Sequence, residues 1–354
     1  MSNALWNPIV VGEISLPHRL AMAPLTRNRS TPEGIPTELN AEYYAQRASH
    51  ALIITEGTQP SADGQGYPVT PGIYTEEHIA GWRKVTDAVH KADGRIVIQL
   101  MHAGRISHPD NTPHHRQPVA PSPVRPTGEM FTASGLQEMP VPRELSTEEV
   151  AATVDDFRRA AAAAIAAGAD GVEIHGANGY LLHQFFATNT NQRTDQYGGS
   201  VENRIRFAVE VATAVADEIG AGRTGIRISP GNPFNDIAES DTHELYPALV
   251  RALAPLDLAY LHIGNHGGDD ELLHTLRKLW PNTLVLNRAG TDIATRAKDV
   301  EDGVADVVTV GTMALANPDL VERIRSGAPL NTPDPATFYG GDEAGYTDYP
   351  THTA

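Results

Sequence analysis

The sequence predicts a single α/β domain that spans residues 1–354, a (β/α)₈ TIM barrel. Short apolar runs alternate with longer amphipathic stretches, and the chain contains eight such units, the number that closes a barrel. The apolar runs are nearly continuous, which is typical of a parallel sheet covered on both faces. An open doubly wound sheet also alternates in this way, but no glycine-rich dinucleotide-binding loop follows the first strand.

The expected strands are short segments dominated by apolar residues, at 19–24, 51–55, 95–100, 171–175, 224–229, 258–263, 283–287 and 306–310. The expected helices are amphipathic segments at 37–49, 76–93, 146–168, 201–219, 242–254, 269–280, 292–303 and 318–326. The helix at 146–168 has the clearest limits. Ser146 can cap its first turn with Glu149 three residues on, and Gly168 favours its end.

Two segments add to the plain barrel. Residues 9–16 precede the first strand and are predicted to form a small hairpin that plugs the bottom of the barrel. Residues 103–145, rich in Pro, His and Gly, connect the third strand to its helix. A connection this long usually has a function, and it follows the carboxyl end of a barrel strand. We therefore expect a lid-like insertion over the catalytic face.

Composition excludes several classes of protein. The absence of cysteine excludes disulfides, Cys-ligated zinc, iron–sulfur clusters and thiol catalysis. A formal net charge of −17 argues against a nucleic-acid groove or an anionic membrane surface. No apolar run reaches the roughly 18–20 residues that span a bilayer, and the first residues lack the pattern of a signal peptide. We expect a cytoplasmic protein with small-molecule partners, as a monomer or a homo-oligomer.

The carboxyl ends of the strands, where barrels carry out chemistry, bear mostly uncharged or cationic groups. They suit a planar anionic cofactor better than a metal ion. Ala289–Gly290 and Gly311–Thr312 end the last two strands, where barrels often bind phosphate, and Asn317–Pro318 is expected to start a helix nearby. Each glycine alone is explained as well by an ordinary turn, but both together favour a phosphate site.

Six segments resemble the old yellow enzyme family, in that family's order along the chain. They are LPHRLAMAPLTR at 16–27, IQLMHAGR at 98–105, EIHGANGYLLHQ at 173–184, RTDQYGGSVENRIR at 193–206, NPDL at 317–320 and TFYGG at 337–341. The resemblance implies an ene-reductase in which FMN is reduced by NADPH or NADH. An α,β-unsaturated carbonyl or nitroalkene then accepts the hydride in a ping-pong cycle. A flavin-binding carrier or sensor with little turnover is the alternative.

The resemblance also implies a set of cofactor-binding residues: Ala23, Pro24, Leu25, Thr26, Gly57, Gln99, His175, Arg227, Ala289, Gly290, Gly311 and Thr312. Thr26 is expected near flavin O4, as in the classical group rather than in relatives with Cys there. Gln99 is expected at the pyrimidine edge, because an amide both donates and accepts. Arg227 is expected beside N1 and O2, with a structural ion pair as the alternative.

The catalytic residues implied are His175, Asn178 and Tyr180. His175 and Asn178 are expected to donate hydrogen bonds to the substrate oxygen, and Tyr180 to protonate the α-carbon. The substrate-binding set is Tyr67, Met101, His175, Asn178, Tyr180 and Tyr339. Taken singly, the histidine and the tyrosines are explained as well by structural roles.

Two positions depart from the family pattern. Met101 stands where relatives usually carry Trp, which predicts a softer pocket wall. Thr312 stands where relatives usually carry Arg, which removes a charge from the expected phosphate site, and Arg288 is a candidate to compensate. Other barrel enzymes fit less well. A Schiff-base aldolase needs a lysine at a strand end, but all four lysines fall in predicted helices. His114–His115 has no partner spacing for a metal site.

Overall fold

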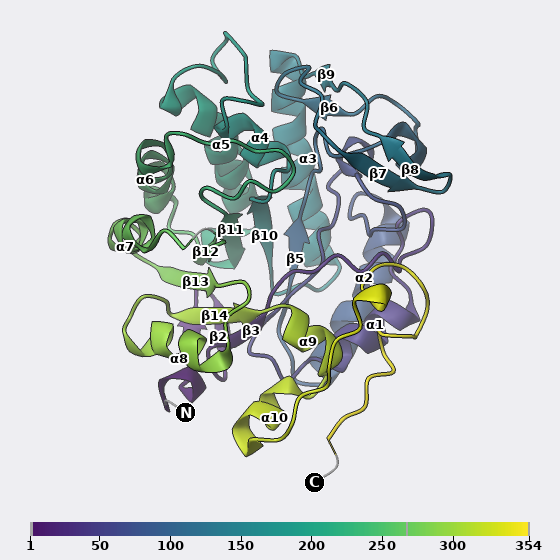
Figure 1. Ribbon diagram of the computed structural model, residues 1–354, viewed down its shortest axis with the longest axis vertical. Helices are drawn as coiled ribbons and strands as arrows, with labels where there is room; N and C mark the ends of the chain where they lie inside the picture. The colour runs from purple at the N-terminus through teal and green to yellow at the C-terminus, as the bar shows by residue number, and fades with distance from the viewer. Residues whose placement is uncertain (1–2, 267, 353–354) are drawn as a thin grey trace.

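Eight parallel strands close into the predicted barrel (Figure 1). The structure is a computed structural model that describes residues 3–266 and 268–352. Each strand lies within its predicted range or extends one residue beyond it. In order around the barrel they are β3 (Leu20–Met22), β4 (Ile53–Ile54), β5 (Ile96–Leu100), β10 (Gly171–Gly176), β11 (Thr224–Ile228), β12 (Tyr260–Gly264), β13 (Thr283–Asn287) and β14 (Val307–Val310). Pairing of Val308 with Leu20 closes the ring between β14 and β3.

The predicted helices surround the barrel as α1 (Glu38–Ala45), α2 (Glu76–Lys91), α3 (Thr147–Ala166), α5 (Val201–Ile219), α6 (Thr242–Leu253), α7 (Asp270–Leu279), α8 (Ile293–Glu301) and α10 (Leu320–Ser326). The short helices α4 (Leu181–Phe186) and α9 (Thr312–Ala316) were not predicted. Single 3₁₀ turns lie at Asn3–Trp6, Ala62–Gly64, Pro109–Asn111, Ala221–Arg223, Ala254–Leu256 and Pro335–Thr337. Within the described ranges, no helix has the length and apolarity needed to cross a membrane.

The start of α3 confirms the predicted cap. The backbone N–H of Glu149 donates to Ser146 Oγ at 3.2 Å, and the Glu149 carboxylate accepts from the Ser146 N–H at 2.8 Å. This reciprocal pair satisfies two of the N–H groups that a helix start leaves without intrahelical partners. Gly168 follows the helix with φ +93°, a backbone conformation that favours glycine.

A hairpin plugs the bottom of the barrel, as predicted. Strands β1 (Ile9–Val11) and β2 (Ile14–Leu16) pair antiparallel, and their buried side chains pack with apolar residues of the barrel strands. Gly12 at the turn has φ +57°, and a Cβ there would lie 2.2 Å from the carbonyl oxygen of Gly222. Only glycine permits this close approach.

The connection between β5 and α3 is more ordered than a simple loop. It contains a parallel pair, β6 (Val119–Ala120) with β9 (Arg143–Glu144), and an antiparallel hairpin, β7 (Glu129–Thr132) with β8 (Gly135–Glu138). Met130 and Met139 from this segment pack in one buried cluster with Met101 and Tyr180. The insertion therefore covers the side of the barrel mouth that holds Tyr180, while its action as a lid stays a prediction.

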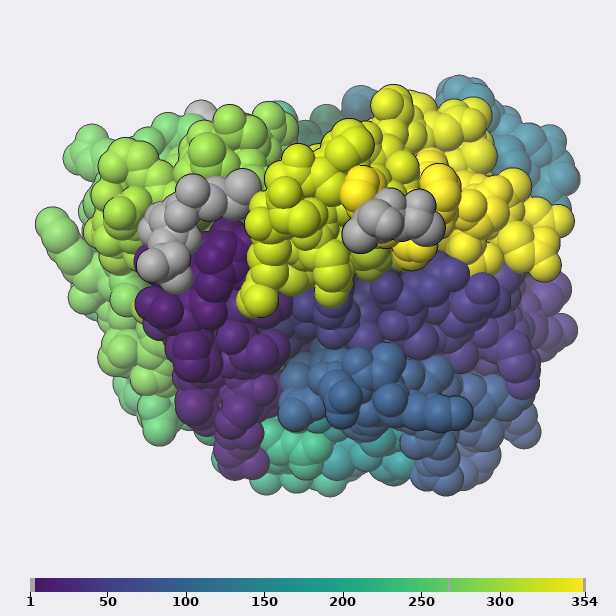
Figure 2. All heavy atoms as spheres, turned by 90° about the horizontal axis from the view of Figure 1, so that it is seen from below, coloured from purple at the N-terminus to yellow at the C-terminus, as the bar shows by residue number. Residues whose placement is uncertain are grey.

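The C-terminal segment folds back beside the N-terminal third of the chain (Figures 1 and 2). Arg27 Nε donates to the carbonyl of Phe338 at 2.9 Å, and Arg47 Nη2 donates to the carbonyl of Tyr346 at 3.2 Å. The Tyr346 ring stacks on Tyr43, with centroids 4.0 Å apart and an interplanar angle of 8°. These contacts hold the segment that carries Tyr339.

Replacing Tyr346 with alanine tests this attachment. The ring is fully buried, so Tyr346→Ala should lower the free energy of unfolding by about 3 kcal/mol and expose the C-terminal segment to limited proteolysis. Tyr339→Ala is the control, because Tyr339 is 70% exposed and its loss should change stability by less than about 0.5 kcal/mol. Equal stabilities for the two variants would contradict the prediction.

Candidate active site

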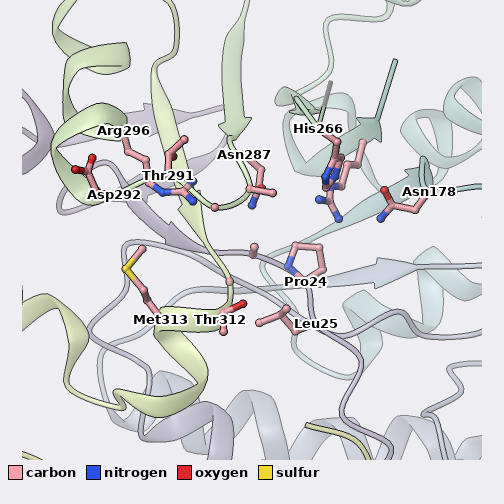
Figure 3. Close-up of a pocket in the computed structure, with 15 residues that line it drawn as sticks. Pro24, Leu25, Asn178, His266, Asn287, Thr291, Asp292, Arg296, Thr312 and Met313 are labelled. Carbon is pink, nitrogen blue, oxygen red and sulfur yellow. The ribbon is translucent and has the colours of Figure 1, made fainter. Parts of the chain in front are cut away.

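A cavity of about 550 Å³ opens at the carboxyl ends of the barrel strands (Figure 3). This volume lies within the range typical of cofactor sites, about 300–1,000 Å³. Eight of the predicted cofactor-binding residues line it: Ala23, Pro24, Leu25, Arg227, Ala289, Gly290, Gly311 and Thr312. The predicted catalytic residue Asn178 also lines it. The structure thus brings together segments that the sequence separates by almost 300 residues.

Two buried polar atoms of the predicted site residues have no hydrogen-bond partner among the described residues. They are Arg227 Nε and His175 Nδ1, on side chains that are at least 95% buried. Arg227 also forms no ion pair in the described part of the chain. A buried guanidinium without an anion is costly. The alternative explanation, a structural ion pair, therefore has no direct partner there, although Glu173 is near enough to raise the pKa of Arg227. An electron-rich, hydrogen-bonding group such as the FMN ring suits these atoms.

A polar chain that the sequence analysis missed crosses the barrel beneath this site. Glu173 accepts from Gln99 Nε2 at 2.7 Å and from His262 Nδ1 at 2.8 Å. The Thr309 hydroxyl lies 3.4 Å from His262 Nε2 and accepts from Asn287 Nδ2 at 2.8 Å. Burial raises the pKa of Glu173, but His262 and Arg227 outweigh it and hold the pKa below its ordinary value. The sequence signal that could have revealed this network is the presence of Glu173 and His262 inside otherwise apolar strands.

The hydrogen bonds of this polar network fix the orientation of the Gln99 side chain. Its amide nitrogen is engaged by Glu173, which fixes the orientation of the side chain. Thr55 Oγ1 accepts from the backbone N–H of Gln99 at 3.1 Å. A fixed amide is what selective contact with one edge of a ring requires.

The predicted catalytic residues come from one short segment after β10. Asn178 adopts the left-handed conformation, with φ +57°, and its N–H donates to Ser229 Oγ at 2.9 Å. Its side-chain oxygen accepts from Asn232 Nδ2 at 2.9 Å, which leaves the amide NH₂ as a donor. The rings of His175 and Tyr180 lie with centroids 5.3 Å apart. The Tyr180 hydroxyl lies 3.0 Å from that of Tyr67, the predicted pocket tyrosine.

Burial keeps both ring side chains uncharged. It raises the pKa of Tyr180 well above its ordinary value, with Tyr67 adding to the effect. It lowers the pKa of His175 well below its ordinary value, and the nearby Arg227 lowers it further. At neutral pH the phenol therefore carries its proton and the imidazole is neutral. Both can donate a hydrogen bond.

Eight predicted site residues do not line the cavity: Thr26, Gly57, Tyr67, Gln99, Met101, His175, Tyr180 and Tyr339. Gly57 contacts Met101 so closely that a Cβ would lie 2.5 Å from the Met101 sulfur, so these two positions constrain each other. Thr26 is partly buried, one residue beyond the lining residue Leu25. Tyr339 is largely exposed, although its phenol is close enough to influence the pKa values of Tyr67 and Tyr180.

Two expectations about the phosphate end are wrong. Asn317 does not cap α10; it follows α9, and its amide donates to the carbonyl of Met313 at 2.9 Å. Arg288 does not line the cavity, because its guanidinium pairs with Asp270 and Asp299, each at 2.8 Å. The cavity instead has lining residues that the sequence did not indicate: His266, Asn287, Thr291, Asp292, Arg296 and Met313.

The barrel and the cavity with its buried arginines have the features expected of a flavin-binding oxidoreductase. A model of the NADH:flavin oxidoreductase / NADH oxidase family matches residues 4–331, and the chain belongs to this family, whose FMN-dependent members include the old yellow enzyme homologues. The predicted family, fold and FMN cofactor are thereby confirmed.

Curated relatives and solved structures match along nearly the whole chain. A probable flavin mononucleotide-dependent alkene reductase of Leishmania infantum is 45% identical over 98% of this chain and 97% of its own. The 12-oxophytodienoate reductase 1 of Oryza sativa subsp. japonica is 44% identical over 98% and 92%. Morphinone reductase in complex with tetrahydroNAD is 44% identical, with a TM-score of 0.95 over 99% and 98%. The old yellow enzyme homologue of Zymomonas mobilis is 40% identical, with a TM-score of 0.94 over 98% and 99%.

The unpaired guanidinium of Arg227 can be tested through flavin affinity. Arg227→Met should weaken binding of FMN by about 10- to 100-fold, because a charged hydrogen bond is lost. Binding of riboflavin should weaken by the same factor, since Arg227 is assigned to the ring and not to the phosphate. Quenching of flavin fluorescence on the deflavinated protein measures both dissociation constants. Unchanged affinity for either flavin would contradict the assignment.

Proposed function

We propose that this protein reduces carbon–carbon double bonds activated by a neighbouring carbonyl or nitro group, taking electrons from NADPH or NADH in a ping-pong cycle. The family and the names of its relatives, which include alkene, 12-oxophytodienoate and morphinone reductases, support this class of reaction. FMN supplies two-electron transfer between nicotinamide and substrate. The residues of the chain bind and orient the substrate and deliver a proton.

The observation that carries the proposal is the buried Tyr180 phenol beside two neutral donors. An α,β-unsaturated carbonyl gains negative charge on its oxygen as its β-carbon is reduced. The neutral His175 imidazole and the Asn178 amide can each donate a hydrogen bond to that oxygen. One such donor typically contributes roughly 3–4 kcal/mol to transition-state stabilisation.

Tyr180 is the proton donor for the α-carbon. Its raised pKa keeps the proton on the phenol until the substrate carbon becomes basic enough to take it. Tyr67 lies at hydrogen-bond distance from the Tyr180 oxygen and fixes the direction of the hydroxyl. The methionine-rich cluster around Tyr180 excludes water from this side. A flavin carrier has no use for a proton donor held in this way.

Replacing the phenol separates the two half-reactions. Tyr180→Phe should slow reoxidation of the reduced enzyme by cyclohexenone by about 10²- to 10⁴-fold, because no general acid remains. Reduction of the flavin by NADPH should change less than about twofold, since that step needs no proton from Tyr180. Stopped-flow absorbance measures each step.

The control is Tyr67→Phe, which removes the neighbouring hydroxyl but keeps the proton donor. It should slow reoxidation much less than Tyr180→Phe. If cyclohexenone reoxidises the reduced wild-type enzyme no faster than buffer alone does, the proposal is wrong and a flavin carrier or sensor is favoured.

Asn232 is expected to position the Asn178 amide. Asn232→Leu removes the donor to Asn178 Oδ1, so the amide can rotate and lose its alignment with the substrate oxygen. The apparent dissociation constant for cyclohexenone should rise about tenfold, the effect of one hydrogen bond. Flavin affinity and flavin reduction serve as controls and should stay unchanged. A parallel loss of flavin affinity would indicate general disruption of the site.

A further inference from the structure

Arg296, in the first turn of α8, is an unexpected lining residue of the cavity. Its side chain is 96% buried, because only 4% is exposed. Figure 3 shows Arg296 on the same side as Thr291, Asp292 and Met313, whereas Asn178 and His266 lie on the other side. The cavity therefore has two ends. We call the first the Arg296 end, formed by Ala289, Gly290, Thr291, Arg296 and Thr312.

Two backbone carbonyls hold the guanidinium of Arg296 in place. Nη1 donates to the carbonyl of Thr309 on β14, and Nη2 donates to that of Arg288 just after β13, each at 2.6 Å. The group thus spans the ends of the two strands whose loops form the Arg296 end. Both acceptors are neutral, so they orient the positive charge without neutralising it.

Arg296 forms no direct ion pair within the described ranges, although the carboxylates of Asp299 and Asp292 are near enough to raise its pKa. Its buried Nε has no hydrogen-bond partner there. Asp292 also lines the cavity, but its carboxylate accepts from the Thr295 N–H at 2.8 Å, and Figure 3 shows it directed away from the Arg296 guanidinium. Burial lowers the pKa of Arg296, although an arginine remains protonated at neutral pH. An anion at this end would offset the cost of burying the charge.

Its neighbours cannot supply the same charge. Arg288 is neutralised by Asp270 and Asp299 outside the cavity, and Thr312 contributes a hydroxyl without charge. Gly290 has φ +76° and open space around the position of a Cβ, so an anion can approach the loop. FMN carries its negative charge at one end, on the phosphate, and its ring at the other. The cavity matches this distribution, with Arg296 at one end for the phosphate and Arg227 assigned to the ring.

We propose that Arg296 supplies the positive charge that binds the FMN phosphate, in place of a side chain at position 312. The inference rests on FMN binding in this cavity and not on which alkene is reduced. It makes Arg296 the residue that distinguishes FMN from riboflavin, which has the same ring without the phosphate. Arg227 is assigned to the ring and should not discriminate between them.

The test compares the two flavins on the deflavinated full chain by fluorescence quenching. Arg296→Met should raise the dissociation constant for FMN about 10- to 100-fold, the effect of one charge-assisted contact, and that for riboflavin less than about twofold. If binding of both flavins weakens equally, Arg296 only connects the ends of β13 and β14 through its hydrogen bonds, and the proposal is overturned. No weakening of either would overturn it as well.

Two further variants keep the test decisive. Arg296→Lys retains a charge and should keep most of the preference for FMN, so it replaces the methionine variant if that variant does not fold; a lysine variant without that preference would overturn the proposal. Arg288→Met is the matched control and should leave the ratio of the two constants unchanged. A collapse of the ratio in the Arg288 variant alone would overturn the assignment. No substrate or NADPH is present, so failure of alkene reduction would not affect the outcome.

Discussion

Positive charge buried at the barrel mouth without a directly paired carboxylate is the constraint on which the site depends. Arg227 and Arg296 both line the cavity, both are at least 95% buried, and neither forms an ion pair within the described ranges. Desolvating a guanidinium costs several kcal/mol unless an anion or strong acceptors compensate it. A ligand with electron-rich groups at two places would therefore compensate the cost of burying these two guanidinium groups. FMN, with a ring at one end and a phosphate at the other, has that distribution.

Burial also sets the protonation of His175 and Tyr180. It favours the neutral form of Tyr180 and of His175, because both charged forms are desolvated there. In the function proposed above, buried cations are assigned to the cofactor and neutral donors to the substrate. Charge that develops on a substrate oxygen is then met by donors already in place. Asn232 and Tyr67 provide the supporting hydrogen bonds that orient two of these groups.

Segments remote from the barrel strands complete the walls of the site. The insertion after β5 contributes Met130 and Met139 to the cluster around Tyr180. The C-terminal segment, held by arginine-to-carbonyl hydrogen bonds and the Tyr43–Tyr346 stack, carries Tyr339. Met101 lies between Gly57 and Tyr180, where a flexible thioether replaces a rigid ring.

The sequence by itself determined the barrel, since alternation of apolar and amphipathic segments depends only on neighbouring residues, and it placed every strand within two residues of its observed limits. It also located the loops that carry Ala23, Gly290 and Gly311, because strand ends follow from strand positions. Only the tertiary structure decided which side chains meet. Glu173 and His262 are 89 residues apart, and Asn178 and Asn232 are 54 apart, so no local pattern links them. Likewise, α8 was predicted, but the contacts of Arg296 with carbonyls on two strands exist only once the barrel has closed.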